Sequence, residues 1–214
     1  MNLLQAICGR RAVRDFKPEP VCTGKLYRLI SAAGWAPSAM NEQPWLFTVI
    51  TDRSFLDEIS VRAKAWTIEN LSGLPRSSHF HDILAEESFH IFYNAPCLIV
   101  ISVTSGSPWM REDAALAAQN LMLMATSLGL GSCWIGFAEG WLNTAEGHQL
   151  LNLPDTERVV APIILGHPRT VPPPVGRKLQ RVNWIGHRYA QGEKIVEDPE
   201  LLAPQFRSPS EEGP

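Results

Sequence analysis

The sequence has few of the residues that build covalent or metal-held frameworks. Its 214 residues include only four cysteines, which lie far apart and form no CxxC pair: Cys8, Cys22, Cys97 and Cys133. Disulfide-stapled secreted domains carry denser cysteine patterns, whereas reduced thiols are typical of cytosolic proteins. We therefore expect mostly buried, reduced thiols and a cytoplasmic location.

Long apolar runs and a strong excess of one charge are also absent. The longest apolar block, APCLIVISV, has the length of a strand and falls well short of the roughly 18 residues of a membrane span. The N-terminus places its two arginines after its apolar residues, which is the reverse of a signal peptide. A formal net charge of −3 creates no field that would recruit nucleic acid. We expect one soluble globular domain that binds neither membrane nor nucleic acid.

The motifs of common catalysts are missing as well. The sequence contains no glycine-rich phosphate loop and no GxSxG element. His79 and His81 flank one phenylalanine without a third ligand, which is typical of a surface loop and not of a metal site. Cys133 lies in an apolar context that favours a buried thiol over a nucleophile. We therefore expect no metal and no catalytic side chain, and a cofactor that supplies the reactivity.

Hydrophobic periodicity predicts helices interspersed with strands. Helices are expected over residues 2–8, 23–34, 54–65 and 111–128, within 83–94, and once or twice within 139–154. Strands are expected over 45–51, 96–103 and 159–168, and residues 132–137 indicate a strand or a loop.

Three residues are expected to bound these helices, and one helix has an unusual surface. Thr23 suits an N-cap, while Gly129 and Gly131 suit the end of the helix over 111–128. Apolar residues occupy nearly every side of that helix, so we expect it to be buried almost all round.

Positive charge gathers in two short stretches. RRAVRDF contains Arg10, Arg11 and Arg14, and GRK contains Arg177 and Lys178. If RRAVRDF is helical, Arg10 and Arg14 stand four residues apart on one face. Guanidinium groups so placed suit a bound phosphate, although this stretch alone favours a solvated basic face.

The stretch APSAMNEQPWLF combines residues that fix the backbone with almost no catalytic groups. Pro37, Asn41 and Pro44 indicate a rigid corner before the strand that begins at Trp45. Such a corner suits the wall of a binding slot for a flat ring, or an ordinary loop that enters a core strand.

Four stretches together resemble the FMN-dependent nitroreductase superfamily. They are RRAVRDF, APSAMNEQPWLFTVI, DAALAAQNLMLMATSLGLGSCWIG and APIILGHP, in this order. The resemblance runs from about residue 4 to residue 180. It implies an α+β fold, a three-layer α/β/α sandwich around a mixed, mainly antiparallel four-stranded sheet. It also implies an interlocked homodimer with FMN at the subunit interface, formed by a domain over 1–184 and a C-terminal extension over 185–214 that wraps the partner or is disordered.

The resemblance also assigns residues around the flavin. Arg10 and Arg11 are expected at the phosphate, joined by Arg177 or Lys178, and Arg14 is expected at the pyrimidine end. Ala12 stands where the family often has serine, so one hydroxyl contact is missing.

The other expected flavin contacts come from two further segments. Pro37, Ser38 and Ala39, with Asn41 of the same corner, are expected to line the flavin of the opposite subunit. Ile135 and Gly136 are expected to approach N5 through their backbone.

The implied activity is hydride transfer from NAD(P)H through FMN to a nitroaromatic, a quinone or a similar oxidised molecule, by a ping-pong mechanism. Two alternatives stay open: a flavin-fragmenting or reductive dehalogenase-type member of the superfamily, and a flavin-binding protein without turnover. Lid residues are expected within 66–94 and 104–112, where Trp66, Trp109 and Met110 either cap a substrate or pack as ordinary core residues.

Overall fold

The computed structural model describes residues 1–70, 82–84, 86–104, 106–173, 175–178, 181, 183 and 185. The chain divides into two units, Met1–Pro172 and Pro173–Pro214. His79, His81 and the residues after 185 lie outside the described residues, and the boundary between residues 184 and 185 stays a prediction. Within the described residues, no helix combines the length and the apolar character that crossing a membrane requires.

Two helices precede the first strand, close to the positions predicted. Helix α1 (Leu3–Gly9) begins with a reciprocal capping box: Gln5 N–H donates to Asn2 Oδ1 (2.8 Å), and Asn2 N–H donates to Gln5 Oε1 (2.9 Å). Helix α2 spans Thr23–Gly34. The prediction of Thr23 as its N-cap is wrong, because Thr23 is already helical and Cys22 occupies the cap without a side-chain hydrogen bond.

Four strands form one sheet in the order β1-β2-β4-β3. They are β1 (Trp45–Ile50), β2 (Cys97–Thr104), β3 (Gly131–Trp134) and β4 (Glu157–Gly166). All three pairings between them are antiparallel. A parallel bridge joins Ala12, which lies outside the four strands, to Ser132 of β3. The predicted mainly antiparallel sheet is therefore confirmed.

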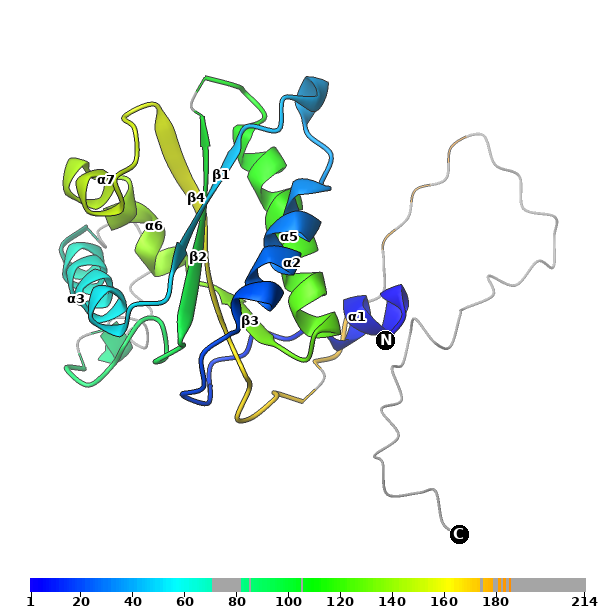
Figure 1. The fold of residues 1–214 in the computed structure, drawn as a ribbon, viewed down its shortest axis with the longest axis horizontal. Coiled ribbons are helices and arrows are strands. Elements are labelled where there is room, and N and C mark those ends of the chain that lie inside the picture. Colours follow the sequence, from blue (N-terminus) through cyan, green and yellow to red (C-terminus); the bar gives the residue numbers. More distant parts are fainter. Residues whose placement is uncertain are drawn as a thin grey trace, which may run out of the picture. The chain divides into compact units, whose positions relative to one another are not determined.

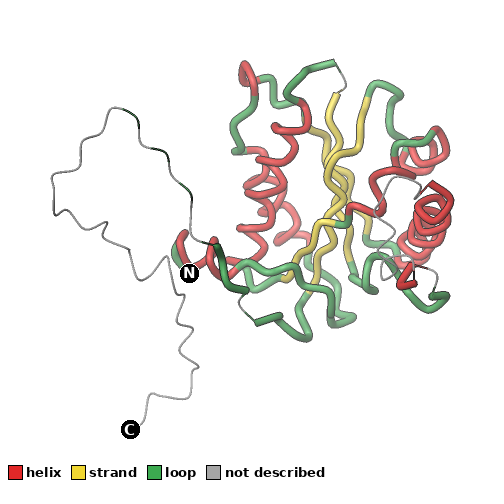
Figure 2. The backbone as a smooth tube through the Cα atoms, turned by 180° about the vertical axis from the view of Figure 1, so that it is seen from behind, coloured by secondary structure: helices red, strands yellow, loops and turns green. Residues whose placement is uncertain are grey.

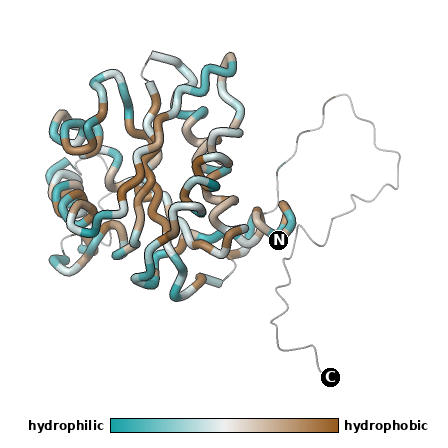
Figure 3. The backbone as a smooth tube through the Cα atoms, in the orientation of Figure 1, coloured by the Kyte–Doolittle hydropathy of each residue, from teal (hydrophilic) through white to brown (hydrophobic). Residues whose placement is uncertain are grey.

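Helices cover both faces of this sheet (Figures 1 and 2). Helices α3 (Arg53–Asn70), α6 (Gly136–Leu142) and α7 (Ala145–Leu151) lie on one face, and α2 and α5 (Met110–Ser127) lie on the other. The most hydrophobic backbone runs through the strands between them (Figure 3). The three-layer α/β/α sandwich expected from the sequence is confirmed.

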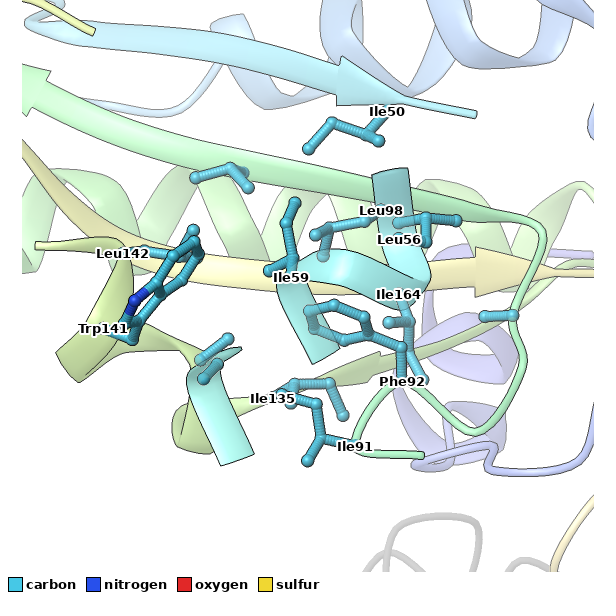
Figure 4. Packing of buried hydrophobic residues seen from close by; sticks show 14 of the residues in the cluster. Ile50, Leu56, Ile59, Ile91, Phe92, Leu98, Ile135, Trp141, Leu142 and Ile164 are labelled. Carbon is cyan, nitrogen blue, oxygen red and sulfur yellow. The ribbon is translucent and has the colours of Figure 1, made fainter. Parts of the chain in front are cut away.

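Each face of the sheet has its own hydrophobic core. On the α3 side, Ile59, Phe92 and Trp141 pack together with residues of β2 and β4 (Figure 4). On the α5 side, alanines and leucines of α5 pack against α2 and the same two strands. Every residue of β2 except Thr104 is buried, which confirms the prediction of a strand covered on both faces.

The prediction that the helix over 111–128 is buried almost all round is wrong for the single chain. One side of α5 packs on the sheet, but Ala115, Leu116 and Gln119 are exposed. Leu116 has 44% of its surface open to solvent. The apolar residues on this outer side therefore lack a partner within the described residues of one chain.

Strand β4 contains a proline although it lies between two other strands. Pro162 has no N–H to donate, and a bulge beside it leaves Val160 without an opposing residue in β2. Asn143, at the end of α6, compensates at the bulge. Its side chain accepts a hydrogen bond from Val159 N–H (2.9 Å) and donates one to Val159 O (2.8 Å).

Two glycines after α5 have different roles. Gly129 adopts a positive φ of 72° and ends the helix as predicted. Gly131 is the first residue of β3, so its predicted role in ending the helix is wrong. A Cβ atom at Gly131 would lie 2.8 Å from the side chain of Val13, and the absence of that atom lets the N-terminal segment approach the strand.

A tightly bonded loop, residues 86–94, replaces most of the helix predicted within 83–94, where only residues 82–84 are helical before it. Lys64 Nζ donates to three carbonyl oxygens in the loop, those of Glu86, Glu87 and Phe89 (2.9–3.2 Å). Ser60 Oγ accepts from Ile91 N–H (3.1 Å). Because both partners lie on α3, this helix fixes the loop.

His90 makes further contacts that hold the loop against α3. Its Nδ1 accepts from Phe92 N–H (3.1 Å), so the ring proton is on Nε2, which contacts Asp57 Oδ1 (3.0 Å). Burial lowers the pKa of His90 below its ordinary value of 6.5, and the hydrogen bond to Asp57 raises it by less. The charges of Arg53 and Lys64 lower this pKa further. Burial therefore outweighs the contact with Asp57 and favours the neutral form of His90.

We predict that replacing Gly131 with alanine destabilises the protein. The new methyl group would overlap Val13, and overpacking of this kind costs about 1–3 kcal/mol. Urea unfolding followed by circular dichroism measures the change. Gly34→Ala in α2 is the matched control, because a Cβ there meets nothing within 4 Å. Equal stability of both variants would contradict the prediction.

We also predict that the stability of the protein falls as the pH drops below about 6.5. Histidine in the unfolded chain takes up its proton near 6.5, whereas folded His90 takes it up at a lower pH. The unfolded state therefore binds more protons in this range and is favoured as the pH falls. His90→Gln should show a smaller loss of unfolding free energy between pH 7 and pH 5. An identical pH dependence of wild type and variant would refute this role.

Candidate functional site

The basic stretch near the N-terminus is extended and not helical. Helix α1 ends at Gly9, and Arg10 has φ −60° and ψ 129°. Bridges join Ala12 to Ser132 and Phe16 to Pro168. The helical arrangement considered for Arg10 and Arg14 is therefore wrong. The segment is nevertheless anchored beside β3, and the charges of both Arg10 and Arg14 act on Cys133 of that strand.

This segment lies against β3 through its backbone. Val13 N–H donates to Ser132 O (3.0 Å), and the Val13 side chain fills the space beside Gly131. Ile135 and Gly136 directly follow β3, so the pairing brings them to the same end of the sheet as the arginines. Ile135 N–H donates to Pro162 O (2.8 Å), so this donor is already used within the sheet. Gly136 has open space where a Cβ would stand.

Arg11 has partners within its own segment. Its Nη1 donates to Cys8 O (2.6 Å) and to Arg10 O (2.8 Å). These bonds hold the turn between α1 and the extended segment. A phosphate contact of Arg11 stays a prediction.

The charges of Arg10 and Arg14 both affect the pKa of Cys133. Its side chain is buried, and burial raises the pKa of its thiol, while the charges of Arg14 and Arg10 lower it by less. Both guanidinium groups therefore act on the same point inside β3. The raised pKa favours the neutral thiol, and the predicted burial of Cys133 is confirmed.

Arg14 is supported by the loop over residues 86–94. Its guanidinium carbon lies 5.8 Å from the centroid of the Tyr93 ring, a cation–π distance. Burial raises the pKa of Tyr93, and the charge of Arg14 opposes that rise. A cavity of about 320 Å³ opens beside this pair. It is lined by Arg14, Asp15, Glu86, Ser88, Phe89, His90, Tyr93 and Asn94.

The proline corner lies at the other end of the sheet. Its short helix η1 (Ala39–Asn41) is near the start of β1, whereas the extended arginine segment runs along the opposite end (Figure 1). One chain therefore does not bring Pro37 and Ser38 to the arginines. Ala39 N–H donates to Asp113 Oδ1 (3.0 Å), which joins the corner to the first turn of α5.

The two remaining cations lie in the second unit of the chain. Arg177 and Lys178 are exposed and belong to residues 173–214. Which of them meets a phosphate, if either does, stays a prediction.

Two residues of this region were missed from the sequence. Tyr93 lies in a stretch without readable periodicity, and no signal pointed to its contact with Arg14. Asp113 carried a signal, because it is a carboxylate in the first turn of a helix otherwise rich in alanine and leucine. Of the lid candidates, Trp66 packs on α6, where a Cβ at Gly140 would lie 2.0 Å from its ring. Residues 71–81, 85 and 105 of the lid segments lie outside the described residues.

Comparisons with known proteins agree with this arrangement. A nitrobenzene nitroreductase from Ectopseudomonas oleovorans is 29% identical over 195 residues, covering 75% of this chain and 84% of the relative. An iodotyrosine deiodinase from Thermotoga neapolitana is 28% identical over 166 residues, covering 74% and 84%. The crystal structure of a nitroreductase with bound FMN from Desulfitobacterium hafniense superposes with a TM-score of 0.74 at 27% identity, covering 86% of this chain and 99% of that one.

The family profile gives the same result over most of the chain. It describes the Nitroreductase family and matches residues 7–167. That range contains the extended arginine segment, the proline corner, the sheet and the backbone after β3. The chain therefore belongs to the Nitroreductase family.

Proposed function

We propose that this protein is an FMN-dependent oxidoreductase that uses NAD(P)H to reduce a nitroaromatic, a quinone or a similar small molecule. The observation that carries the proposal is the extended segment that contains Arg10 and Arg14 and pairs with β3 next to Gly136. Support comes from the FMN-bound nitroreductase structure, which shares the fold of this chain.

The described residues fit FMN in three respects. Arg10 and Arg14 supply cations for a phosphate and for the pyrimidine end of a flavin. The backbone at Gly136 borders open space that a flat ring can occupy. Ser132, which bridges to Ala12, has a buried hydroxyl oxygen without a hydrogen-bond partner among the described residues. Ala12 lacks the hydroxyl that the family often has at this position. In this proposal, the remaining cations and the backbone replace its contact with the phosphate.

A homodimer completes the site in this proposal. Within one chain, the arginine segment and the corner lie at opposite ends of the sheet. A second copy therefore has to supply the corner, with Pro37, Ser38, Ala39 and Asn41. Exposed apolar side chains around the corner and on α2 and α5 offer the surface for such an interface. They are Tyr27 (69% exposed), Trp35 (85%), Met40 (91%) and Leu116 (44%). Monomeric proteins seldom leave large apolar patches open to solvent.

When bound, FMN would accept hydride from a nicotinamide and deliver two electrons to an acceptor. The chain contributes position and charge. Arg14, held by Tyr93, would place a positive charge beside the pyrimidine edge, where negative charge collects on reduction. The proline corner would give one rigid wall, and the backbone at Gly136 would allow close approach on the side of N5. We expect no side-chain acid or base in this mechanism.

Reductive dehalogenation is a second candidate, because the iodotyrosine deiodinase relative is 28% identical over 74% of this chain. It would replace the halogen of a halogenated aromatic with hydrogen, releasing halide and consuming two electrons and a proton. Iodide release from an iodinated phenol separates this activity from the reduction of a nitroarene or quinone.

The proposed function is tested by an anaerobic absorbance spectrum of the full chain loaded with FMN. We expect a flavin spectrum that bleaches on addition of NADH or NADPH and recovers with a nitroarene or quinone, and a dimer in sedimentation. A monomer that takes up no FMN would refute the proposal. Bound flavin that neither nicotinamide bleaches would favour a flavin-binding protein without turnover.

We predict that Arg14→Ala lowers the flavin reduction potential and slows reduction by NAD(P)H. Losing the cation should lower the potential by roughly 30 mV or more, since 30 mV corresponds to about 1.4 kcal/mol for a two-electron couple. Equilibration with a reference dye measures the potential. Arg62→Ala is the control, because Arg62 lies on α3, outside both proposed flavin-binding regions, and pairs with Glu58 of the same helix. An unchanged potential in Arg14→Ala would show that Arg14 is not at the pyrimidine edge.

A further inference from the structure

The proline corner is held in a backbone conformation that its own residues disfavour. Met40, Asn41 and Gln43 have positive φ angles of 51°, 56° and 50°. Asparagine tolerates this left-handed region, but long side chains such as those of methionine and glutamine seldom adopt it. Residues in such conformations persist only when their surroundings hold them. Contacts from outside these three residues must therefore fix the corner.

Part of the support is local. Ser38 Oγ accepts from Gln43 N–H (2.9 Å), and Asn41 Oδ1 accepts from Gln43 Nε2 (3.2 Å). Ser38 O accepts from Asn41 N–H (3.0 Å). These bonds tie the ends of the corner to each other, but they do not tie the corner to the body of the protein.

Asp113 provides that tie from 74 positions away in the sequence. Its Oδ1 accepts from Ala39 N–H at 3.0 Å, and only 3% of Asp113 is exposed. The residue lies in the first turn of α5, where the positive end of the helix dipole stabilises a carboxylate. Because α5 packs along its length on the sheet, Asp113 is a rigid anchor.

The bond fixes one peptide unit at both ends. In a trans peptide the N–H and the C=O point in opposite directions. The N–H between Ser38 and Ala39 is held by Asp113, and the C=O of the same unit is held by Asn41 N–H. The orientation of this peptide plane, and with it the surface that Pro37 and Ser38 present, therefore depends on Asp113.

The other carboxylate oxygen makes Asp113 unusual. Its Oδ2 is buried and has no hydrogen-bond partner among the described residues. A buried carboxylate oxygen without a partner costs free energy, so a residue of this kind in the core needs a compensating role. Packing alone does not supply one, because an apolar side chain would fill the same space without that cost.

We propose that Asp113 is a positioning residue for FMN: it holds Ala39 N–H and thereby sets the corner as a wall for the flavin of the partner subunit. This inference rests on the proposed function. Asp113 touches neither the reacting atoms nor the flavin in this role, and acts through the backbone of Ala39.

Three substitutions separate this role from a general effect on folding. Asp113→Ala removes the acceptor. Asp113→Asn keeps an oxygen that can accept from Ala39 N–H, so it should rescue the anchor. Ala39→Pro removes the donor and leaves Asp113 in place. Ser38 has ψ 156° and Ala39 is the first residue of η1, which are conformations that suit the residue before a proline and the proline itself.

The first measurement is titration of each apoprotein with FMN, followed by flavin fluorescence. We expect the dissociation constant to rise about tenfold in Asp113→Ala and in Ala39→Pro, and less than about threefold in Asp113→Asn. The double variant Asp113→Ala/Ala39→Pro should bind FMN no more weakly than either single variant, because both changes remove the same hydrogen bond. Wild-type affinity in Ala39→Pro, or an Asn variant as weak as the Ala variant, would overturn the inference.

The second measurement needs no flavin. Amide hydrogen exchange at Ala39 in the apoprotein should accelerate in Asp113→Ala and stay protected in Asp113→Asn. Wild-type protein that fails to bind FMN would overturn the proposed function and this inference together. Wild-type protein that binds FMN, with an Asp113→Ala variant that binds it equally well, would overturn the inference alone. If Asp113→Ala does not fold, Ala39→Pro compared with wild type decides.

Discussion

The close contact between the N-terminal segment and β3 is the constraint on which the candidate site depends. Gly131 has no side chain, and Val13 occupies the space that a Cβ would need. This contact lets the segment pair with Ser132 through the backbone. Pairing through the backbone holds Arg10 and Arg14 beside β3, where the charges of both act on Cys133. The position of Arg10 and Arg14 thus depends on glycine at position 131, because a Cβ there would overlap Val13.

Helix α5 connects the two regions that the proposed dimer would combine. Its first turn contains Asp113, which holds the corner, and its last turn leads through Gly129 into β3. Both parts are therefore positioned by the packing of one helix against the sheet. In the proposed dimer, each copy would give its corner to one flavin and its arginines to the other, and α5 would set the spacing between them.

The sequence was sufficient to predict the elements with strong patterns. The strands around Ile99 and Ile163 and the helix around Leu121 have the apolar content of a core, and they are where we expected them. The exposed side of α5 was missed because apolar residues on every side of a helix do not show which side is covered within one chain. Leu116 is an example, since it is apolar and yet lies on the exposed side of the helix.

The candidate site was predicted in part, and for a physical reason. Local chemistry marked Arg14 and Pro37, because charge and backbone stiffness are properties of single residues. The contacts of Tyr93 and Asp113 join residues far apart in the sequence, and such contacts follow from the fold. The arginine segment shows the same limit: its charges were evident, but its extended form follows from pairing with β3, which no local pattern displays.

The interruption within β4 has a consequence for how the sheet assembles. Uninterrupted strands can slide past each other by two residues and still form every hydrogen bond, so several alignments compete. Here Pro162 offers no donor, Val160 has no opposing residue in β2, and the Asn143 side chain bonds to both backbone groups of Val159. A shifted alignment would leave these groups opposite the wrong neighbours. The irregular strand therefore favours one alignment of β4 over shifted ones. The same alignment fixes the position of Ile135, where the chain leaves β3, because Ile135 N–H donates to Pro162 O.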